Sequence, residues 1–420
     1  NSSHYNSDIK VLCAMMMLNI FICVLMGVSR NLGHYKRGQQ KVLVPSKRFW
    51  RPQTLSKSYW NREQQRLDFI YSPIFNSPLC SETFHMLPEW LNDTAPLNPC
   101  EPDYSIRTQI LDYNTLPQRF QDFLLHMRCR SYPMLINQPH ACEQNPFLLL
   151  AVKSLIPHFD RRQAIRETWG RAGELVNRTV VTVFLLGNTL SSDHFPDLLG
   201  MLDHEAKIHK DLLYWDYRDT FFNLTLKEVL FLEWFSKHCS QAQYVLKGDD
   251  DVFVNTYKII DFLEGLSDAR AKDLFLGDVI SNAAPHRDHK LKYFIPESMF
   301  VGRYPAYAGG GGYLYSGELA MRLHNVSKQV VLYPIDDVYT GMCLKKLGLV
   351  PEMHTGFKTF DIDKKYRHNP CIYRNLMLVH SRTPQEMLKI WSWIVTNTDQ
   401  TQATRSQAKS LRLAYFFQTC

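Results

Sequence analysis

Three consecutive aspartates, Asp249, Asp250 and Asp251, lie between two apolar stretches in the segment YVLKGDDDVFVN, residues 244–255. Adjacent carboxylates repel one another, and a divalent cation removes that repulsion. Carboxylates two positions apart just after a strand can converge on one side of the chain. Such oxygen ligands suit Mg²⁺ or Mn²⁺, and the ion could hold the diphosphate leaving group of a nucleotide donor. A solvated acidic turn is the alternative interpretation.

A second acidic pair, Asp336 and Asp337, begins the helical pattern YPIDDVYTGMCLKKLG at residues 333–348. The helix dipole alone favours acids in a first turn. A transferase with a metal-bound leaving group also needs a base on the far side of the reacting carbon, and a carboxylate here suits that role. His380 follows an apolar, strand-like run in LMLVHSR. It becomes a metal-ligand candidate only if the fold brings it to the aspartates.

Two further stretches could contact a ligand. The segment RRQAIRETWG places Arg161, Arg162 and Arg166 near the first strand–helix turn, where a nucleotide phosphate or base could lie. Surface charge, with Trp169 in the core, is the alternative. The four glycines at 309–312 permit close approach of the backbone to a ligand, although a flexible surface loop is equally consistent with them. The run lacks the spacing and the Lys of a P-loop, which argues against a Walker-type ATPase.

Strand and helix patterns alternate from residue 146 onward and must position these groups. Strands are predicted at 146–154, 179–187, 211–217 and 243–251, with helices at 159–170, 195–209 and 225–239. This alternation predicts an α/β fold with a mostly parallel sheet and helices on both faces. Ligands of such sheets bind beyond the carboxyl ends of the strands, which is where the three aspartates fall.

The uncharged, apolar-rich residues 11–28 predict a membrane span, since 18 such residues are about the minimum that crosses a bilayer. A cleaved signal peptide is the alternative, but the segment is longer than a usual signal core. Basic residues are denser after the span than before it, which by the positive-inside rule would place the rest of the chain in the cytosol. Because the chain begins with Asn1 rather than Met, this charge count does not decide the orientation.

Glycosylation sequons and eight cysteines beyond the span favour a domain in the lumen. The sequons lie at Asn92, Asn177, Asn223 and Asn325. We therefore expect a tail at 1–10, a signal anchor at 11–28, a stem at 29–100, an extension at 101–145, a catalytic domain at 146–398 and a weakly ordered tail at 399–420. The extension should contain a helix at 117–128 and a disulfide between Cys129 and Cys142, with unpaired thiols as the alternative. A net charge of +7 without a dense basic block argues against nucleic acid as a partner.

Four motifs in order give the chain a family resemblance: AIRETWG, KGDDDVFVN, YPAYAGGGGY and DDVYTGMCL. From about residue 145 to 395 the chain resembles the Golgi β1,3-glycosyltransferases, known as glycosyltransferase family 31. The form YPIDDVYTG, with Asp336 where many galactosyltransferase members carry Glu, is similar to the N-acetylglucosaminyltransferase branch that extends poly-N-acetyllactosamine. The charge bias around the span departs from the family topology, and Cys80 and the C-terminal tail have no place in the pattern.

The resemblance implies a GT-A fold, a Golgi membrane protein with one span and a lumenal catalytic domain, and Mn²⁺ as cofactor, with Mg²⁺ as a substitute. It implies metal ligation by Asp251, Asp249 and His380. It implies Asp337 as the catalytic base. The implied donor-binding residues are Arg166, Lys247, Asp249 and Asp250. The implied acceptor or donor loop comprises Tyr307, Gly310, Gly311 and Asp336.

The activity implied by the resemblance is inverting transfer of N-acetylglucosamine from UDP-GlcNAc to the 3-hydroxyl of a terminal galactose on glycoproteins and glycolipids. A β1,3-galactosyltransferase using UDP-galactose is the alternative with the same mechanism. A catalytically inactive glycan-binding protein is a third hypothesis, which the retention of both the aspartate cluster and Asp337 disfavours. A homodimer, or association with other glycosyltransferases, stays open.

Overall fold

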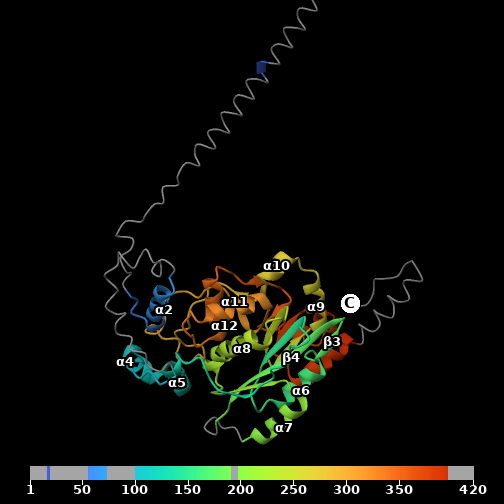
Figure 1. Ribbon diagram of the computed structural model, residues 1–420, viewed down its shortest axis with the longest axis horizontal. Coiled ribbons are helices and arrows are strands. Elements are labelled where there is room, and N and C mark those ends of the chain that lie inside the picture. The colour runs from blue at the N-terminus through green and yellow to red at the C-terminus, as the bar shows by residue number, and fades with distance from the viewer. Residues whose placement is uncertain (1–16, 19–54, 73–99, 191–196, 396–420) are drawn as a thin grey trace, which may run out of the picture. The chain divides into compact units, whose positions relative to one another are not determined.

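The computed structural model describes residues 17–18, 55–72, 100–190 and 197–395. The chain divides into two units, Asn1–Thr54 and Leu55–Cys420, and the second contains all the elements discussed below (Figure 1). Most of the predicted span, the sequon at Asn92 and the predicted tail at 399–420 lie outside the described residues. None of the helices within the described ranges combines the length and the apolar character that a bilayer crossing requires.

A nine-stranded mixed sheet forms the centre of the second unit, in the order β1-β5-β4-β2-β6-β9-β8-β10, with β3 paired to β4. Four neighbouring strands are parallel and confirm the four predicted ones: β5 (Leu212–Arg218), β4 (Arg178–Asn188), β2 (Leu148–Lys153) and β6 (Tyr244–Asp249). The others are β1 (Met134–Ile136), β3 (Gly173–Leu175), β8 (Phe275–Ile280), β9 (Tyr307–Ser316) and β10 (Glu352–Met353). Strands β1, β3 and β9 run antiparallel to their neighbours and the other six strands share one direction, so the sheet is mostly but not wholly parallel.

Helices cover both faces of this sheet, as predicted. Successive side chains of a strand point to opposite faces, so Leu149 and Ala151 enter one hydrophobic core while Leu148 and Leu150 enter another. The first core includes α8 (Leu224–His238), α11 (Gly317–Ser327) and α12 (Asp336–Lys346). The second includes α6 (Phe159–Glu167), α7 (Leu199–His209) and α9 (Thr256–Glu264). Figure 1 shows α8, α11 and α12 grouped together, apart from α6 and α7.

A three-stranded sheet lies next to the aspartate turn, in the order β11 (Phe357–Lys358), β12 (Leu378–His380) and β7 (Val252–Val254). Strand β7 begins directly after Asp251, and β12 pairs antiparallel to it with His380 opposite Val252. This pairing brings the histidine to the aspartates although 129 positions separate His380 from Asp251 (380 minus 251). The strand-like pattern before His380 is therefore confirmed, and the register of β12 against β7 explains why His380 lies near Asp251.

The glycine run is a strand and not a loop, so the interpretation of Gly310, Gly311 and Tyr307 as loop residues is wrong. These residues belong to β9, between β6 and β8. A Cβ at Gly311 would lie 3.1 Å from the Cβ of His380, and one at Gly312 would lie 2.4 Å from Leu378 Cδ1. The missing side chains therefore allow β12 to pack closely against β9.

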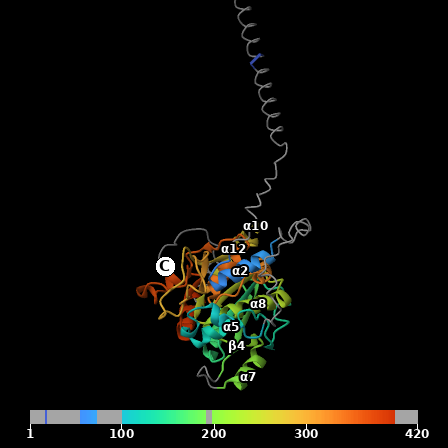
Figure 2. The ribbon, with the colours of Figure 1, turned by 90° about the vertical axis from the view of Figure 1, so that its left-hand side faces the viewer.

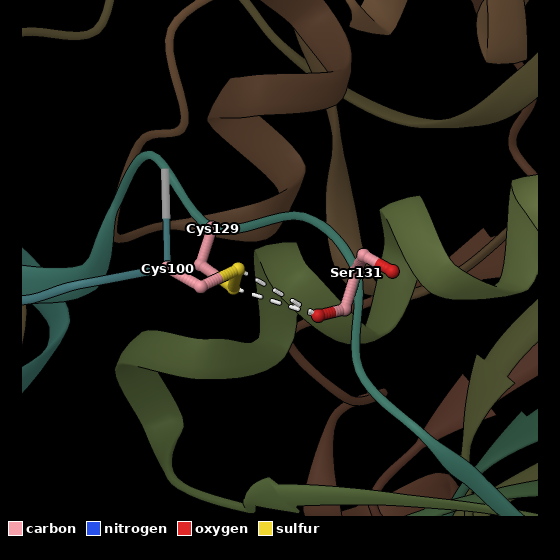
Figure 3. Close-up of a disulfide and its surroundings, with 3 residues drawn as sticks. All are labelled: Cys100, Cys129 and Ser131. Carbon is pink, nitrogen blue, oxygen red and sulfur yellow. Dashed lines mark hydrogen bonds between the residues drawn. A yellow bond between two sulfur atoms is a disulfide. The ribbon is translucent and has the colours of Figure 1, made fainter. Parts of the chain in front are cut away.

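The N-terminal part of the unit contains α2 (Tyr59–Ile70), α4 (Ile106–Gln109) and α5 (Gln118–His126), the last of which confirms the helix predicted at 117–128. Between described residues, disulfides join Cys100 to Cys129 and Cys142 to Cys239. Figure 3 shows the first, beside the carbonyl of Ser131. The predicted Cys129–Cys142 bridge is therefore wrong. Strand β1, which lies between Cys129 and Cys142 in the chain, pairs with β5. Cys239 directly follows α8, so the Cys142–Cys239 bridge connects the segment after β1 to the end of that helix.

Candidate active site

The predicted metal ligands converge at the carboxyl end of β6. Asp249 ends that strand, Asp251 lies in the following turn and His380 ends β12. One ligand atom from each of these side chains lies within 4.8 Å of the others. The Nε2 atom of His380 is 3.5 Å from Oδ1 of Asp251. Two carboxylates and one imidazole form a donor set that could hold a divalent cation.

The orientation of His380 supports this role. Its Nδ1 atom lies 3.0 Å from the carbonyl oxygen of Thr359, and because a carbonyl only accepts, Nδ1 donates there. The lone pair of Nε2 is thus left for the side of Asp251, an arrangement common among metal-ligating histidines. The hydrogen bond to Asp251 raises the pKa of His380, and burial opposes this rise only in part.

Asp250 does not belong to this cluster, because its carboxylate is buried on the other side of the turn. It accepts hydrogen bonds from Ser154 Oγ at 2.6 Å, His158 Nδ1 at 2.7 Å and Arg161 Nη1 at 2.8 Å. Burial alone would raise the pKa of Asp250, but these hydrogen bonds outweigh burial and lower it. Asp250 therefore anchors the turn that presents its two neighbours.

Lys153, which the sequence did not single out, connects the two acidic clusters. Its Nζ atom lies 2.9 Å from Oδ1 of Asp249 and 2.9 Å from Oδ2 of Asp336, and it donates to the Gly310 carbonyl at 3.2 Å. Burial would lower the pKa of Lys153, but the two carboxylates outweigh burial and raise it. Lys153 therefore links Asp249, a predicted metal ligand, to Asp336, the neighbour of the predicted base Asp337.

Asp337 adjoins this bridge at the first turn of α12. Its Oδ1 accepts a hydrogen bond from the backbone N–H of Val338 at 2.7 Å, and a Cβ on Gly310 would lie 3.5 Å from its Oδ2. Burial, together with the charge of Asp336, raises the pKa of Asp337 to about 7. The pKa of Asp336 is lowered, because the effect of Lys153 outweighs that of burial. The neighbouring acids are thus differentiated, and a carboxyl group with a pKa near neutrality suits a general base.

Tyr307 lies at the start of β9 on the side of Asp337. A Cβ on Gly341 of α12 would approach the Cβ of Tyr307 to 2.8 Å, so the strand and the helix are in close contact here. Burial raises the pKa of Tyr307, and the negative charge of Asp337 adds to the rise. The Tyr307 hydroxyl therefore stays protonated and can donate a hydrogen bond.

Lys247, an expected donor-binding residue, belongs to β6, and its side chain is fully buried on the side of α8. It is paired with Glu228 of α8, and its Nζ lies 5.3 Å from the ring centroid of Phe231. Burial, with the nearby positive charge of Lys153, lowers the pKa of Lys247 well below its usual range. The structure thus separates Lys247 from the surface at which a donor would bind.

Arg166, the other expected donor-binding cation, faces away from the aspartate turn. Its guanidinium is bonded to both carboxylate oxygens of Asp211, at 2.7 and 2.9 Å, and to Glu205 of α7 at 2.8 Å. Arg161 reaches the turn instead, 2.8 Å from Asp250 and 3.8 Å from Asp251. The sequence itself distinguishes Arg161 from Arg166, because residues five positions apart lie about 140° apart around a helix and so face different directions.

The sequons within the described ranges differ in exposure. Asn177 lies in the exposed turn between β3 and β4, and Asn325 is exposed on α11. Asn223 is half-buried, and its amide donates to the Arg218 carbonyl at 2.7 Å. Attachment of glycans at these sites stays a prediction.

Replacing Lys153 with methionine should test its role as the bridge. The change leaves the buried Asp336 and the half-buried Asp249 without their shared cation, which we expect to destabilise the fold by about 3 kcal/mol and to reduce catalysis by roughly 100-fold. Urea unfolding and steady-state kinetics measure the two effects. Lys207, exposed and paired with Asp203 one turn away, provides the matched control, since Lys207→Met should change stability by under about 0.5 kcal/mol. Near-normal activity of Lys153→Met would contradict the bridging role.

Comparisons with known proteins find related sequences. A family model described as galactosyltransferase matches residues 160–355. The chain is 57% identical over 384 residues to N-acetyllactosaminide beta-1,3-N-acetylglucosaminyltransferase 2 of Mus musculus and 56% identical to that of Homo sapiens, each alignment covering 91% of this chain and 96% of the relative. It is 42% identical over 294 residues to UDP-GlcNAc:betaGal beta-1,3-N-acetylglucosaminyltransferase 7 of Rattus norvegicus, covering 68% of this chain and 73% of the relative.

Proposed function

The chain belongs to the galactosyltransferase family, and from this membership we propose that it transfers N-acetylglucosamine from UDP-GlcNAc to the 3-hydroxyl of terminal galactose in poly-N-acetyllactosamine synthesis. The family resemblance inferred from the four motifs is thereby confirmed. The observation that carries the proposed activity is the ammonium group of Lys153, which lies 2.9 Å from both Asp249 and Asp336. A leaving-group site and a base are thus adjacent in a chain 57% identical to a named N-acetylglucosaminyltransferase.

The reaction is a single displacement in which Asp337 is the base. The Asp337 carboxylate takes the proton of the galactose 3-hydroxyl while that oxygen forms a bond to the anomeric carbon of the donor sugar. The bond between that carbon and the diphosphate oxygen breaks on the opposite side, and its electron pair leaves with UDP. An α-linked donor therefore gives a β-linked product. Asp337 must be ionised to act, and Lys153 holds the adjacent Asp336 as a carboxylate.

A divalent cation is part of the proposal. Asp249, Asp251 and His380 would hold it, and it would supply positive charge beside the departing diphosphate. Mn²⁺ suits the mixed oxygen and nitrogen donors, with Mg²⁺ as a substitute. Arg161, within 3.8 Å of Asp251, adds a protein cation on the same side.

The proposed setting is the lumen of the Golgi, with residues 11–28 as a signal anchor and the second unit as the catalytic domain. The disulfides Cys100–Cys129 and Cys142–Cys239, both between described residues, support an oxidising compartment, because such bridges are rare in the cytosol. The exposed sequons at Asn177 and Asn325 are consistent with the same compartment.

A donor and acceptor panel tests the activity. The full chain is incubated with UDP-GlcNAc or UDP-galactose and with acceptors ending in galactose or in N-acetylglucosamine, and products are identified by mass and linkage analysis. We expect turnover with UDP-GlcNAc on galactose-ended acceptors. Turnover with UDP-galactose alone would replace the proposal by a β1,3-galactosyltransferase. Absence of transfer together with glycan binding would indicate an inactive glycan-binding protein.

A further inference from the structure

Helix α2 lies within residues 29–100, which are expected to form a stem, yet it packs closely on the catalytic domain. Tyr59 and Trp60 at its start are 1% and 7% exposed and belong to the same core as α8 and α12. Figure 2 shows α2 beside α12, and an ion pair between Asp68 and Lys346 joins the two helices. This degree of burial distinguishes α2 from a spacer.

The first turn of α2 is bonded to the segment that precedes β9. The backbone N–H groups of Tyr59 and Trp60 donate to the carbonyls of Ser298 and Met299, each at 2.8 Å. These two bonds satisfy donors that a helix N-terminus would otherwise leave open. The same segment continues to Tyr307, beside Asp337. The start of α2 therefore fixes the backbone that enters the acceptor side of the site.

The same helix also holds the segment that precedes α12. The indole Nε1–H of Trp60 donates to the Val331 carbonyl at 3.1 Å. The amide of Gln64 accepts from the Val331 N–H and donates to the Gln329 carbonyl, each at 2.9 Å. Residue 331 lies six positions before the proposed base, so α2 also fixes the approach to α12.

An aromatic cluster joins the two segments. The Trp60 ring packs edge-on against Phe300 and Tyr333, with centroids 5.3 and 5.8 Å apart. The hydroxyls of Tyr333 and Tyr304 lie 2.8 Å apart. Tyr304 precedes Tyr307 by three residues, and Tyr333 precedes Asp336 by three. Trp60 thus contacts both of the segments that lead into β9 and α12.

We propose that Trp60 is a positioning residue for the transfer reaction, which makes α2 a functional part of the catalytic domain. Within the described part of the chain, Trp60 contacts neither the metal-ligand cluster nor Asp337, so it acts through Phe300, Tyr304 and Tyr333. Its loss should misplace the base relative to the acceptor hydroxyl and leave the donor side intact. This inference rests on the proposed transferase activity.

The test compares Trp60→Ala, Trp60→Phe and the control Tyr71→Ala in the full chain. Tyr71 is an aromatic residue at the end of the same helix, 47% exposed. We measure kcat, the KM of each substrate, donor hydrolysis without acceptor and Tm. Trp60→Ala should lower kcat for transfer by about 100-fold, the scale of a misplacement of about 1 Å. The donor KM and the donor hydrolysis rate should stay within about twofold of the wild type, since donor-side contacts are unchanged. Trp60→Phe should recover most of the transfer rate, and Tyr71→Ala should match the wild type.

Two results would overturn the inference: a kcat for Trp60→Ala within twofold of the wild type, or equal losses of transfer and donor hydrolysis, which indicate general unfolding. If Trp60→Ala does not fold, Gln64→Met, which removes the two bonds to the 329–331 segment, carries the same prediction with the same readouts. A wild-type chain that transfers galactose instead would refute the proposed donor, and the Trp60 comparison would then be made with that donor.

Discussion

Asp337→Asn is expected to lower the rate of transfer by about 10²- to 10⁴-fold, the contribution of a positioned general base. Asparagine keeps the shape of the side chain but cannot take the acceptor proton. The donor side stays intact, so stabilisation of the protein by UDP with Mn²⁺ should persist in thermal unfolding. Asp268→Asn, at an exposed first-turn acid of another helix, is the control and should leave the rate unchanged. Turnover of Asp337→Asn within tenfold of the wild type would remove Asp337 from the mechanism.

The pH dependence of the same variant gives a second readout. Below about pH 7 Asp337 is protonated and cannot act as the base, so kcat/KM of the wild type should rise with pH up to neutrality. A raised carboxyl pKa contributes stability at acid pH that is lost as pH rises through the folded-state pKa. Asp337→Asn should therefore exceed the wild type in Tm above about pH 7 and resemble it near pH 4. If Asp337→Asn were less stable than the wild type at all pH values, this would contradict a buried carboxyl group with a raised pKa at position 337.

Removal of divalent cations should have the other largest effect. EDTA should reduce transfer by roughly 100-fold or more, because several kcal/mol of charge stabilisation at the leaving group is lost, and Mn²⁺ should restore it. Mn²⁺ should also raise Tm by binding only the folded state. Asp251→Ala should lose both effects.

The control for this experiment is Asp261→Ala, which removes an exposed carboxylate of α9 outside the cluster. It should keep the Mn²⁺-dependent rise in Tm and the transfer rate. Transfer that persists in the chelator would contradict the role given to Asp251. A Tm rise retained by Asp251→Ala would place the cation elsewhere.

The strand–helix alternation was predictable because the parallel strands are buried on both faces and form continuous apolar runs. Their order also places the aspartates at a carboxyl edge. The role of Lys153 was not predictable, because a single lysine at a strand end does not show which acids it contacts. Its contacts with Asp249 and Asp336 exist only because β2 pairs with β6 and the start of α12 lies beside the end of β2. Arg161, the cation at the aspartate turn, belongs to the predicted arginine cluster, and the helical period separates it from Arg166 by about 140°.

The glycine strand and the disulfides show two other limits of sequence reasoning. Glycines are depleted in strands, so a run of four indicates a loop unless the neighbours that exclude a side chain are known. Those neighbours, such as Leu378 beside Gly312, are distant in the chain. Cysteine connectivity likewise depends on how distant elements pack, and proximity in sequence wrongly suggested Cys129 with Cys142.

The lysine shared by the two acids has a consequence for attempts to redesign the enzyme. Since Lys153 touches Asp249 and Asp336 at equal distances, a substitution at position 153 made to accommodate a new nucleotide sugar will also alter the environment of the proton acceptor. A substitution of Lys153 therefore cannot change the preference for the donor without also changing the activation of the acceptor. Directed evolution toward another sugar should therefore begin at positions remote from β2 and treat position 153 as fixed.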